Sequence, residues 1–215
     1  MNEFEKGLMS YLGKERLQRL SKVKVGIAGA GGLGSNCALH LVRSGFKYFK
    51  IVDFDLVESS NLNRQFFFMD QLGYPKVLAL KENLSRINPD IRIEAIQQRV
   101  DKNNARMLFD DCDAVVEAFD KVECKIMMVE SFSSSGKFFV CASGLAGWGN
   151  SDEIRIRQMN DKFYIIGDFV NEVTEGVPPI SPRVNIAAAK QADLILSYFI
   201  NDDRDSNFRR GDGVG

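Results

Sequence analysis

The chain has 215 residues, 45% of them hydrophobic, and its 28 Lys and Arg residues nearly balance 29 Asp and Glu residues. This length allows one substantial hydrophobic core, and the small net charge argues against general attraction to nucleic acid or an acidic membrane surface. No stretch approaches the roughly 18 to 20 apolar residues that cross a bilayer, and the opening residues MNEFEKGLMS are too polar for a secretory leader. We therefore expect a cytoplasmic protein with a single domain over residues 1–200 and a disordered polar tail over residues 201–215.

The four cysteines, Cys37, Cys112, Cys124 and Cys141, are far apart in the sequence, and His40 is the only histidine. The chain has no C-x-x-C pair, which is the usual ligand spacing of a structural zinc site, so no zinc is expected. Because the cysteines fall in or beside predicted helices and strands, we interpret them as small buried hydrophobic residues.

Predicted helices and strands alternate along the chain. An amphipathic helix or helix pair, interrupted at Gly13, comes first over residues 3–20. Strands are expected at residues 22–28, 48–55, 91–98, 113–119, 137–143, 152–159 and 162–169, and further helices after the loop 29–34 and over residues 75–87, 103–109, 121–135 and 183–200. This order predicts an α/β, Rossmann-like fold with a doubly wound, mainly parallel sheet that the strands 152–159 and 162–169 extend in antiparallel orientation.

A glycine-rich loop, GAGGLGS at residues 29–35, joins the first strand to the following helix. Gly29 would make a tight turn, Gly31 would let the backbone approach a phosphate, and Gly34 would allow close helix packing. The start of a helix also favours an anion, and Asp53 at the end of the second strand can accept hydrogen bonds from a ribose. By themselves these features fit NAD as well as ATP.

The segment after Asp53 favours ATP. It carries Asp55, Asn61, Arg64 and Gln65, and Lys76 opens the next helix. A triphosphate has more negative charge than a nicotinamide dinucleotide, and two cations can neutralise that charge during attack on phosphorus. The alternative for each cation alone is a solvated surface residue.

Asp120 follows the strand over residues 113–119. Ligands of open α/β sheets bind beyond the carboxyl ends of the strands, so Asp120 should face the same crevice as Asp53. A carboxylate there could hold Mg²⁺, which prefers oxygen ligands and keeps water and phosphate oxygens around it. The alternative is that Asp120 caps the helix beginning near Lys121.

The motifs GAGGLGS, VDFD, SNLNRQ, GYPK, INPD and EAFD occur in this order over residues 23 to about 125. The ordered set resembles the adenylating domain of the ThiF, MoeB and ubiquitin-activating family, and SPRVNIAAAKQADLIL is similar to the family's last helix. Within the family, SGLAGWG and the end of the last helix near residue 200 look most like a short ThiF variant, a ThiS adenylyltransferase associated with thiamine biosynthesis.

The resemblance implies that the C-terminal glycine carboxylate of a small ubiquitin-like sulfur carrier, similar to ThiS and ending in Gly-Gly, is adenylated by Mg-ATP with release of pyrophosphate. It also implies a homodimer. No cysteine precedes the last helix where relatives often carry one, so adenylation would be the whole chemistry. The residues carried over as nucleotide-binding are Gly29, Gly31, Gly32, Gly34, Asp53, Asp55, Asn61, Arg64 and Lys76, with Asp120 on Mg²⁺ and with Arg64, Lys76 and Asp120 as catalytic residues.

Three other functions compete with this interpretation. An NAD-dependent oxidoreductase would leave NLNRQ and GYPK unexplained and would lack a recognisable catalytic motif. The related dehydratase that adenylates a carboxylate on modified tRNA is disfavoured by the near-neutral charge and the short C-terminal region. A noncatalytic scaffold is disfavoured because Asp53, Arg64, Lys76 and Asp120 are all present.

Overall fold

The computed structural model describes residues 1–170 and 176–201. Apart from Asn201, the tail that the sequence predicts to be disordered lies outside the described residues. No helix within the described part of the chain combines the length and apolar character needed to cross a membrane.

A seven-stranded sheet, counted over the described residues, forms the centre of the molecule with the strand order β3-β2-β1-β4-β5-β7-β6. Its strands are β1 (Lys24–Ala28), β2 (Tyr48–Val52), β3 (Arg92–Ile96), β4 (Ala114–Glu117), β5 (Phe138–Ala142), β6 (Arg155–Asn160) and β7 (Phe163–Gly167). All neighbouring strands are parallel except β6 and β7, which are antiparallel. The Rossmann-like, mainly parallel sheet predicted from the sequence is confirmed.

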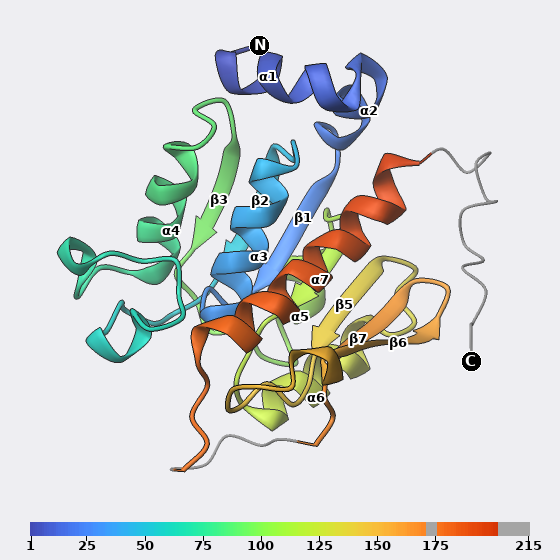
Figure 1. Ribbon diagram of the computed structural model, residues 1–215. Coiled ribbons are helices and arrows are strands. Elements are labelled where there is room, and N and C mark those ends of the chain that lie inside the picture. The colour runs from blue at the N-terminus through green and yellow to red at the C-terminus, as the bar shows by residue number, and fades with distance from the viewer. Residues whose placement is uncertain (171–175, 202–215) are drawn as a thin grey trace.

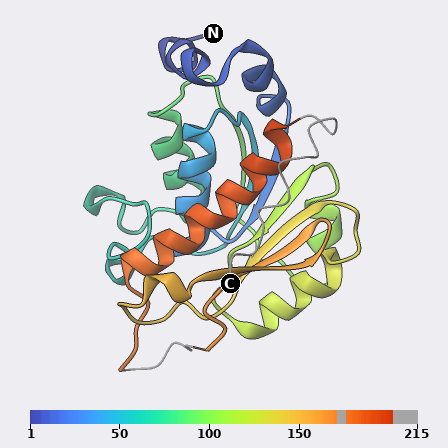
Figure 2. The same cartoon turned by 45° about the vertical axis from the view of Figure 1, so that its right-hand side comes forward.

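Helices cover both faces of this sheet (Figures 1 and 2). The helices are α1 (Glu3–Leu12), α2 (Lys14–Leu20), α3 (Gly32–Arg43), α4 (Lys76–Ser85), α5 (Ala105–Leu108), α6 (Val122–Phe132) and α7 (Ser181–Ile200). One core packs α3, α4 and α7 against the sheet, and a second core on the opposite face contains α5 and α6. β1, β4 and β5 are almost wholly apolar because both of their faces are buried.

The N-terminal segment is a helix pair rather than one helix. Gly13 separates α1 from α2 and has a φ of +79°, a conformation that side-chain-bearing residues rarely adopt. Arg19 of α2 donates a hydrogen bond of 2.7 Å to the carbonyl oxygen of Ile200 at the end of α7. The pair therefore lies at the amino ends of the parallel strands, the upper edge of the sheet in Figure 1.

In the antiparallel pair β6 and β7, burial decides which strand takes the inner position in the sheet. β7, which comes later in the sequence, is the inner strand and pairs with β5, whereas β6 forms the edge. Phe163 of β7 is buried and stacks on Phe139 at 5.1 Å between ring centroids, while all six residues of β6 are exposed. The more apolar strand therefore takes the inner position.

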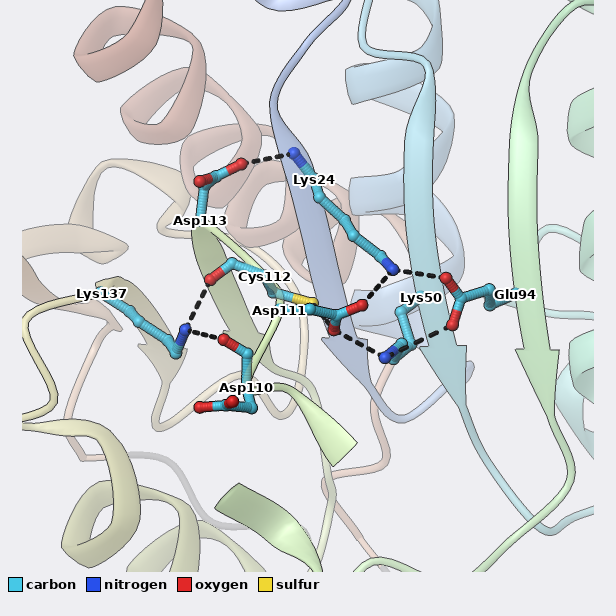
Figure 3. Close-up of polar contacts among 8 residues, drawn as sticks. All are labelled: Lys24, Lys50, Glu94, Asp110, Asp111, Cys112, Asp113 and Lys137. Atoms are coloured by element: carbon cyan, nitrogen blue, oxygen red, sulfur yellow. Dashed lines mark hydrogen bonds and ion pairs between the residues drawn. The ribbon is translucent and has the colours of Figure 1, made fainter. Parts of the chain in front are cut away.

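Charged side chains from β1, β2 and β3 meet on one half-face of the sheet. Lys24 and Lys50 lie between two carboxylates there, Asp111 and Glu94, and each lysine pairs with both (Figure 3). Lys50 Nζ lies 2.6 Å from Asp111 Oδ1 and 3.3 Å from Glu94 Oε2. Because their charges are balanced within the network, these side chains cover the half-face without leaving an unpaired lysine.

Candidate functional site at the carboxyl ends of the central strands

The strands β2, β1 and β4 lie side by side, and the winding of the sheet reverses between β1 and β4. α3 follows β1 on one face, whereas α6 follows β4 on the other. Loops 29–31, 53–75 and 118–121 leave these strands at one edge, the lower edge in Figure 1. Such a reversal point is where open α/β sheets bind their ligands.

The glycine loop is packed so tightly that side chains are excluded at two positions. Gly29 has a φ of +100°, and a Cβ there would lie 2.9 Å from the carbonyl oxygen of Ala118. A Cβ on Gly34 would lie 1.9 Å from the carbonyl oxygen of Gly29. α3 begins at Gly32 with Gly31 as its N-cap, so the first amides of the helix and its positive dipole end lie at this edge. The loop can therefore receive an anion.

Asp53 joins the loop after β2 to the glycine loop. Its Oδ2 accepts a hydrogen bond from the Ala30 amide at 2.6 Å, and its Oδ1 accepts one from the Asp55 amide at 2.8 Å. The residue is only 8% exposed. Each carboxylate oxygen still has a lone pair for a further donor such as a ribose hydroxyl.

Lys76 and Asp55 are brought together. Lys76 is the first residue of α4, is 6% exposed, and its Nζ lies 2.9 Å from Asp55 Oδ2. The Lys76 amide also donates to the Asp55 carbonyl oxygen at 2.9 Å. Both residues were predicted for the site from sequence, but nothing in the sequence indicated that they pair with each other.

Asn61 has a role within its own loop. It lies in a short 3-10 helix, Ser59–Asn61, and its Oδ1 accepts a hydrogen bond from the Glu58 amide at 3.0 Å. Among the described residues, its Nδ2 makes only a long contact of 3.4 Å with Ser60 Oγ. The amide donor of Asn61 can therefore still serve a phosphate oxygen.

Arg64, in the loop 53–75, packs beside the first residue of α3. Its Cγ would be 3.4 Å from a Cβ on Gly32, and its Nη1 donates to the Ser60 carbonyl oxygen at 3.0 Å and to Asn63 Oδ1 at 2.7 Å. Burial lowers the pKa of the Arg64 guanidinium, and the negative charge of Asp120 opposes that shift. The fold thus brings Asp120 near enough to Arg64 for their charges to interact, although the two residues are 56 positions apart in the sequence.

Gln65 is a site residue to which the sequence interpretation gave no role. It is 9% exposed, and its Nε2 would lie 3.7 Å from a Cβ on Gly31. Its Oε1 is buried and has no hydrogen-bond partner among the described residues. An orphaned buried acceptor beside an anion-binding loop is a cost to the free protein that a bound ligand with donor groups can remove.

Asp120 is exposed and does not cap α6. The helix begins at Val122, its N-cap is Lys121, and no side-chain hydrogen bond caps it. The alternative interpretation of Asp120 as a helix cap is therefore not what the structure shows. Within residues 1–170 and 176–201, no three His, Cys, Asp or Glu side chains are grouped so that they could hold a metal ion. Mg²⁺ at Asp120 would thus need phosphate oxygens and water for most of its ligands.

Glu117 and Lys125 were missed by the sequence interpretation. Glu117 ends β4 and is fully buried, and both of its carboxylate oxygens lie 3.1 Å from Lys125 Nζ. The sequence did contain a signal for this pair, the glutamate that directly follows three apolar residues in the strand AVVE. A carboxylate buried with such a strand needs a charged or hydrogen-bonding partner.

The cysteines are all free, and Cys37, Cys112 and Cys141 are buried. Burial raises the pKa of the Cys112 and Cys141 thiols to about 12, with a smaller contribution from Asp111 to the first and from Glu117 to the second. The pKa of the Cys37 thiol is raised by burial alone. These three thiols remain protonated near neutral pH, so they behave as the small hydrophobic residues expected from the sequence.

Comparisons with known proteins agree on one family. The family model described as ThiF matches residues 5–165. The chain is 33% identical over 131 residues to a sulfur carrier protein adenylyltransferase of Thermus thermophilus, an alignment that covers 60% of this chain and 48% of that protein. It is 28% identical over 155 residues to tRNA threonylcarbamoyladenosine dehydratase 2 of Saccharomyces cerevisiae, which covers 70% of this chain and 35% of that protein.

The fold is similar to that of the E. coli tRNA N6-threonylcarbamoyladenosine dehydratase TcdA, solved in complex with AMP, with a TM-score of 0.83 and 19% identity over 95% of both chains. The chain spans about half the length of the Thermus relative and about a third of the yeast one. Because the family model covers residues 5–165 of 215, this chain belongs to the ThiF family.

Proposed function

We propose that this chain uses Mg-ATP to adenylate a carboxylate, and that its substrate is the C-terminal glycine of a small ubiquitin-like, ThiS-like sulfur carrier ending in Gly-Gly. The observation that carries the proposal is that Arg64 packs beside Gly32 of a glycine loop that can receive an anion, and that the charge of Asp120 acts on Arg64. Lys76, paired with Asp55, enters from the same loop after β2. Membership in the ThiF family and the sulfur carrier adenylyltransferase among the relatives support it.

The residues fit a nucleoside triphosphate. The amides of the loop containing Gly29, Gly31, Gly32 and Gly34 would meet phosphate oxygens, and the carboxylate of Asp53 would accept from the ribose. Gln65, whose Nε2 lies beside Gly31, also has a buried Oε1 without a hydrogen-bond partner among the described residues, and a donor group of the nucleotide could satisfy it.

Cations and amides would then share the charge of the phosphates. Arg64 and Lys76 would stabilise the negative charge that builds up as the substrate carboxylate attacks the α-phosphorus, and the free donor of Asn61 would contact a phosphate oxygen. Asp55 would hold Lys76 in place through their ion pair. No protein nucleophile is required, because positioning and charge neutralisation supply the catalysis.

Asp120 would be the protein ligand of Mg²⁺. The metal would neutralise phosphate charge and polarise a phosphoryl oxygen. The exposed carboxylate of Asp120 and the absence of a capping bond to α6 leave it available for this role.

The carrier, the assembly and the pathway are parts of the same proposal. We infer a homodimer, because α7 has apolar side chains around most of its circumference and family members pair. A role in thiamine biosynthesis follows from the resemblance to short ThiF variants.

The direct test is ATP–pyrophosphate exchange with a panel of purified carriers that end in Gly-Gly, each compared with a form lacking the last two glycines. Exchange that depends on the carrier and on its terminal glycines supports the proposal. Exchange with no carrier in a panel that includes ThiS-like proteins contradicts the substrate assignment.

A dehydratase acting on modified tRNA is the second candidate, and a specific observation favours it. The dehydratase alignment covers 70% of this chain, and the fold similarity to TcdA extends over 95% of both chains, so a short C-terminal region does not argue against this function. AMP formation that depends on tRNA carrying N6-threonylcarbamoyladenosine, with no exchange on any carrier, would select the dehydratase.

A further inference from the structure

A buried carboxylate ends the central strand next to the glycine loop. Glu117 pairs in register with Ala28, the last residue of β1, and it is fully buried. Its carboxylate accepts hydrogen bonds from Lys125 Nζ, from the Phe119 amide at 2.7 Å and from the Ala142 amide at 3.4 Å. One side chain thus joins β4, α6 and β5 at the edge that carries the candidate site.

The bond to Phe119 lies in the turn that leads to Asp120, next to a backbone bond of 2.9 Å from the Ala118 amide to the Ala28 carbonyl oxygen. Asp120 follows Phe119 directly, and the Asp120 side chain makes no hydrogen bond to any described residue, so its position depends on its backbone. The same turn packs closely against the glycine loop. If Gly29 carried a Cβ, that atom would lie 2.9 Å from Ala118 O and 3.3 Å from Phe119 Cδ1. A change in this turn would therefore move Asp120, and it would also alter the packing of residues 118 and 119 against Gly29.

Stability alone does not account for a charge at this place. A buried ion pair can often be replaced by apolar residues of similar volume without loss of stability, because desolvating two charges offsets their attraction. An apolar residue at position 117 would, however, leave the partly buried amide of Phe119 without its side-chain acceptor. The carboxylate is thus suited to fixing a backbone turn rather than to filling the core.

We propose that Glu117, held by Lys125, is a positioning residue that fixes the turn 118–120 and thereby sets Asp120 toward the metal and the α-phosphate. This inference rests on the proposed adenylation and adds to it a residue that touches no substrate. Loss of the groups that orient a metal ligand typically weakens metal binding about 10- to 100-fold, and we expect a loss of this size here.

Two paired variants separate geometry from charge. E117Q/K125M removes both charges but keeps a side-chain oxygen that can accept from the Phe119 amide. E117L/K125M removes both charges and the acceptor. If Glu117 acts through the turn, E117Q/K125M keeps most of the pyrophosphate-exchange activity, whereas E117L/K125M loses it.

The first measurement uses the free protein and needs no activity. Hydrogen exchange of the Phe119 amide, followed by NMR, should remain slow in the wild type and in E117Q/K125M and become much faster in E117L/K125M. Should E117L/K125M fail to fold, E117A/K125A removes the same acceptor without added bulk. Unchanged protection of the Phe119 amide in folded E117L/K125M or E117A/K125A would overturn the proposal.

The second measurement is a double-mutant cycle with D120N, read as pyrophosphate exchange at varied Mg²⁺. E117L/K125M should raise the Mg²⁺ concentration for half-maximal exchange about tenfold or more while the KM for the carrier stays near the wild-type value. Because Glu117 acts through Asp120, the same change should add little in a D120N background. Additive losses would show that Glu117 acts elsewhere and would overturn the proposal.

A matched control uses a second buried acid that pairs with a lysine. Lys47 Nζ lies 2.6 Å from Glu5 Oε1, and this pair joins α1 to the start of β2, at the opposite end of the strands. E5L/K47M should change the thermal midpoint but not the Mg²⁺ dependence. A wild-type protein that binds no Mg-ATP by calorimetry would refute the proposed function itself, whereas normal binding with an unshifted Mg²⁺ requirement in E117L/K125M would refute only the role of Glu117.

Discussion

Lys76 Nζ lies 2.9 Å from Asp55 Oδ2, and the backbone amide of Lys76 donates to the Asp55 carbonyl oxygen at the same distance. The two residues thus close the base of the loop between β2 and α4, which contains Asn61 and Arg64. The lysine is buried while the aspartate side chain is about half exposed, so the pair lies at the boundary between the core and the candidate site.

Lys76→Met should reduce pyrophosphate exchange by about 100- to 1,000-fold, the usual loss when one preorganised charge is removed from a transition state. Methionine keeps the packing of the buried stem, so the effect on stability should be smaller than that of Lys76→Ala. Lys81→Met, an exposed lysine on the same helix, is the control and should behave as wild type. Near-normal exchange by folded Lys76→Met would remove Lys76 from the catalytic residues.

Asp120→Asn should lower exchange at saturating Mg-ATP by about 100- to 1,000-fold because the neutral amide is a poor ligand for Mg²⁺. Asp120 is exposed and makes no capping bond to α6, so the free energy of unfolding should change by no more than about 0.5 kcal/mol. Arg64→Ala should give a similar loss of exchange. Asp90→Asn, at an exposed position outside the site, serves as the control, and full activity of Asp120→Asn would show the metal assignment to be wrong.

Mg-ATP should bind more tightly than NAD. Arg64 and Lys76 lie at the same edge as the glycine loop, and their two positive charges suit a triphosphate better than a dinucleotide. Titration calorimetry with each nucleotide measures both dissociation constants. Tighter binding of NAD would restore the oxidoreductase interpretation.

Replacing all four cysteines by alanine should leave most of the exchange activity intact. Burial keeps the Cys112 and Cys141 thiols protonated, with pKa values of about 12, and no thiol takes part in attack on phosphorus. The thermal midpoint should fall, because the loss of buried sulfur atoms creates small cavities. An inactive variant that melts at the wild-type temperature would reveal a cysteine in the chemistry.

The ion-pair network of Figure 3 should make stability depend on pH in acid. Desolvation would raise the pKa of Asp111, but hydrogen bonds and charge from Lys24 and Lys50 hold it at about 2, below its ordinary value of 3.8. A hydrogen bond from Lys24 likewise lowers the pKa of Glu94. Since the folded-state pKa is depressed, the contribution of Asp111 is fully present above about pH 4 and is lost as the pH falls toward 2.

Urea unfolding of the wild type and Asp111→Asn measures this effect. The difference in midpoint should be constant from pH 7 to about 5 and should shrink toward zero between about pH 4 and 2. Asp90→Asn, which touches no lysine of the network, is the control. A difference that stays constant down to pH 2 would show that Asp111 contributes through packing rather than through its charge.

Local sequence patterns were enough to predict most elements. Alternating or continuous apolar residues identified the strands, and Gly13 and Pro75 fell at helix boundaries because glycine and proline restrict the backbone wherever they occur. The position of β7 between β5 and β6 could not be read in this way. It depends on which strand buries more apolar surface against β5, and that comparison involves residues far apart in the chain.

The sequence by itself determined that a glycine loop follows the first strand, that Asp53 ends the second, and that cations and a further acid follow them. Only the tertiary structure decided their partners: Lys76 with Asp55, Arg64 near Asp120, and Glu117 with Lys125. A motif reports the chemistry of each residue, because that chemistry is carried by the side chain itself. Which charges meet depends on the order of parallel strands and on the face that each crossover takes, and these are set by packing of the whole core.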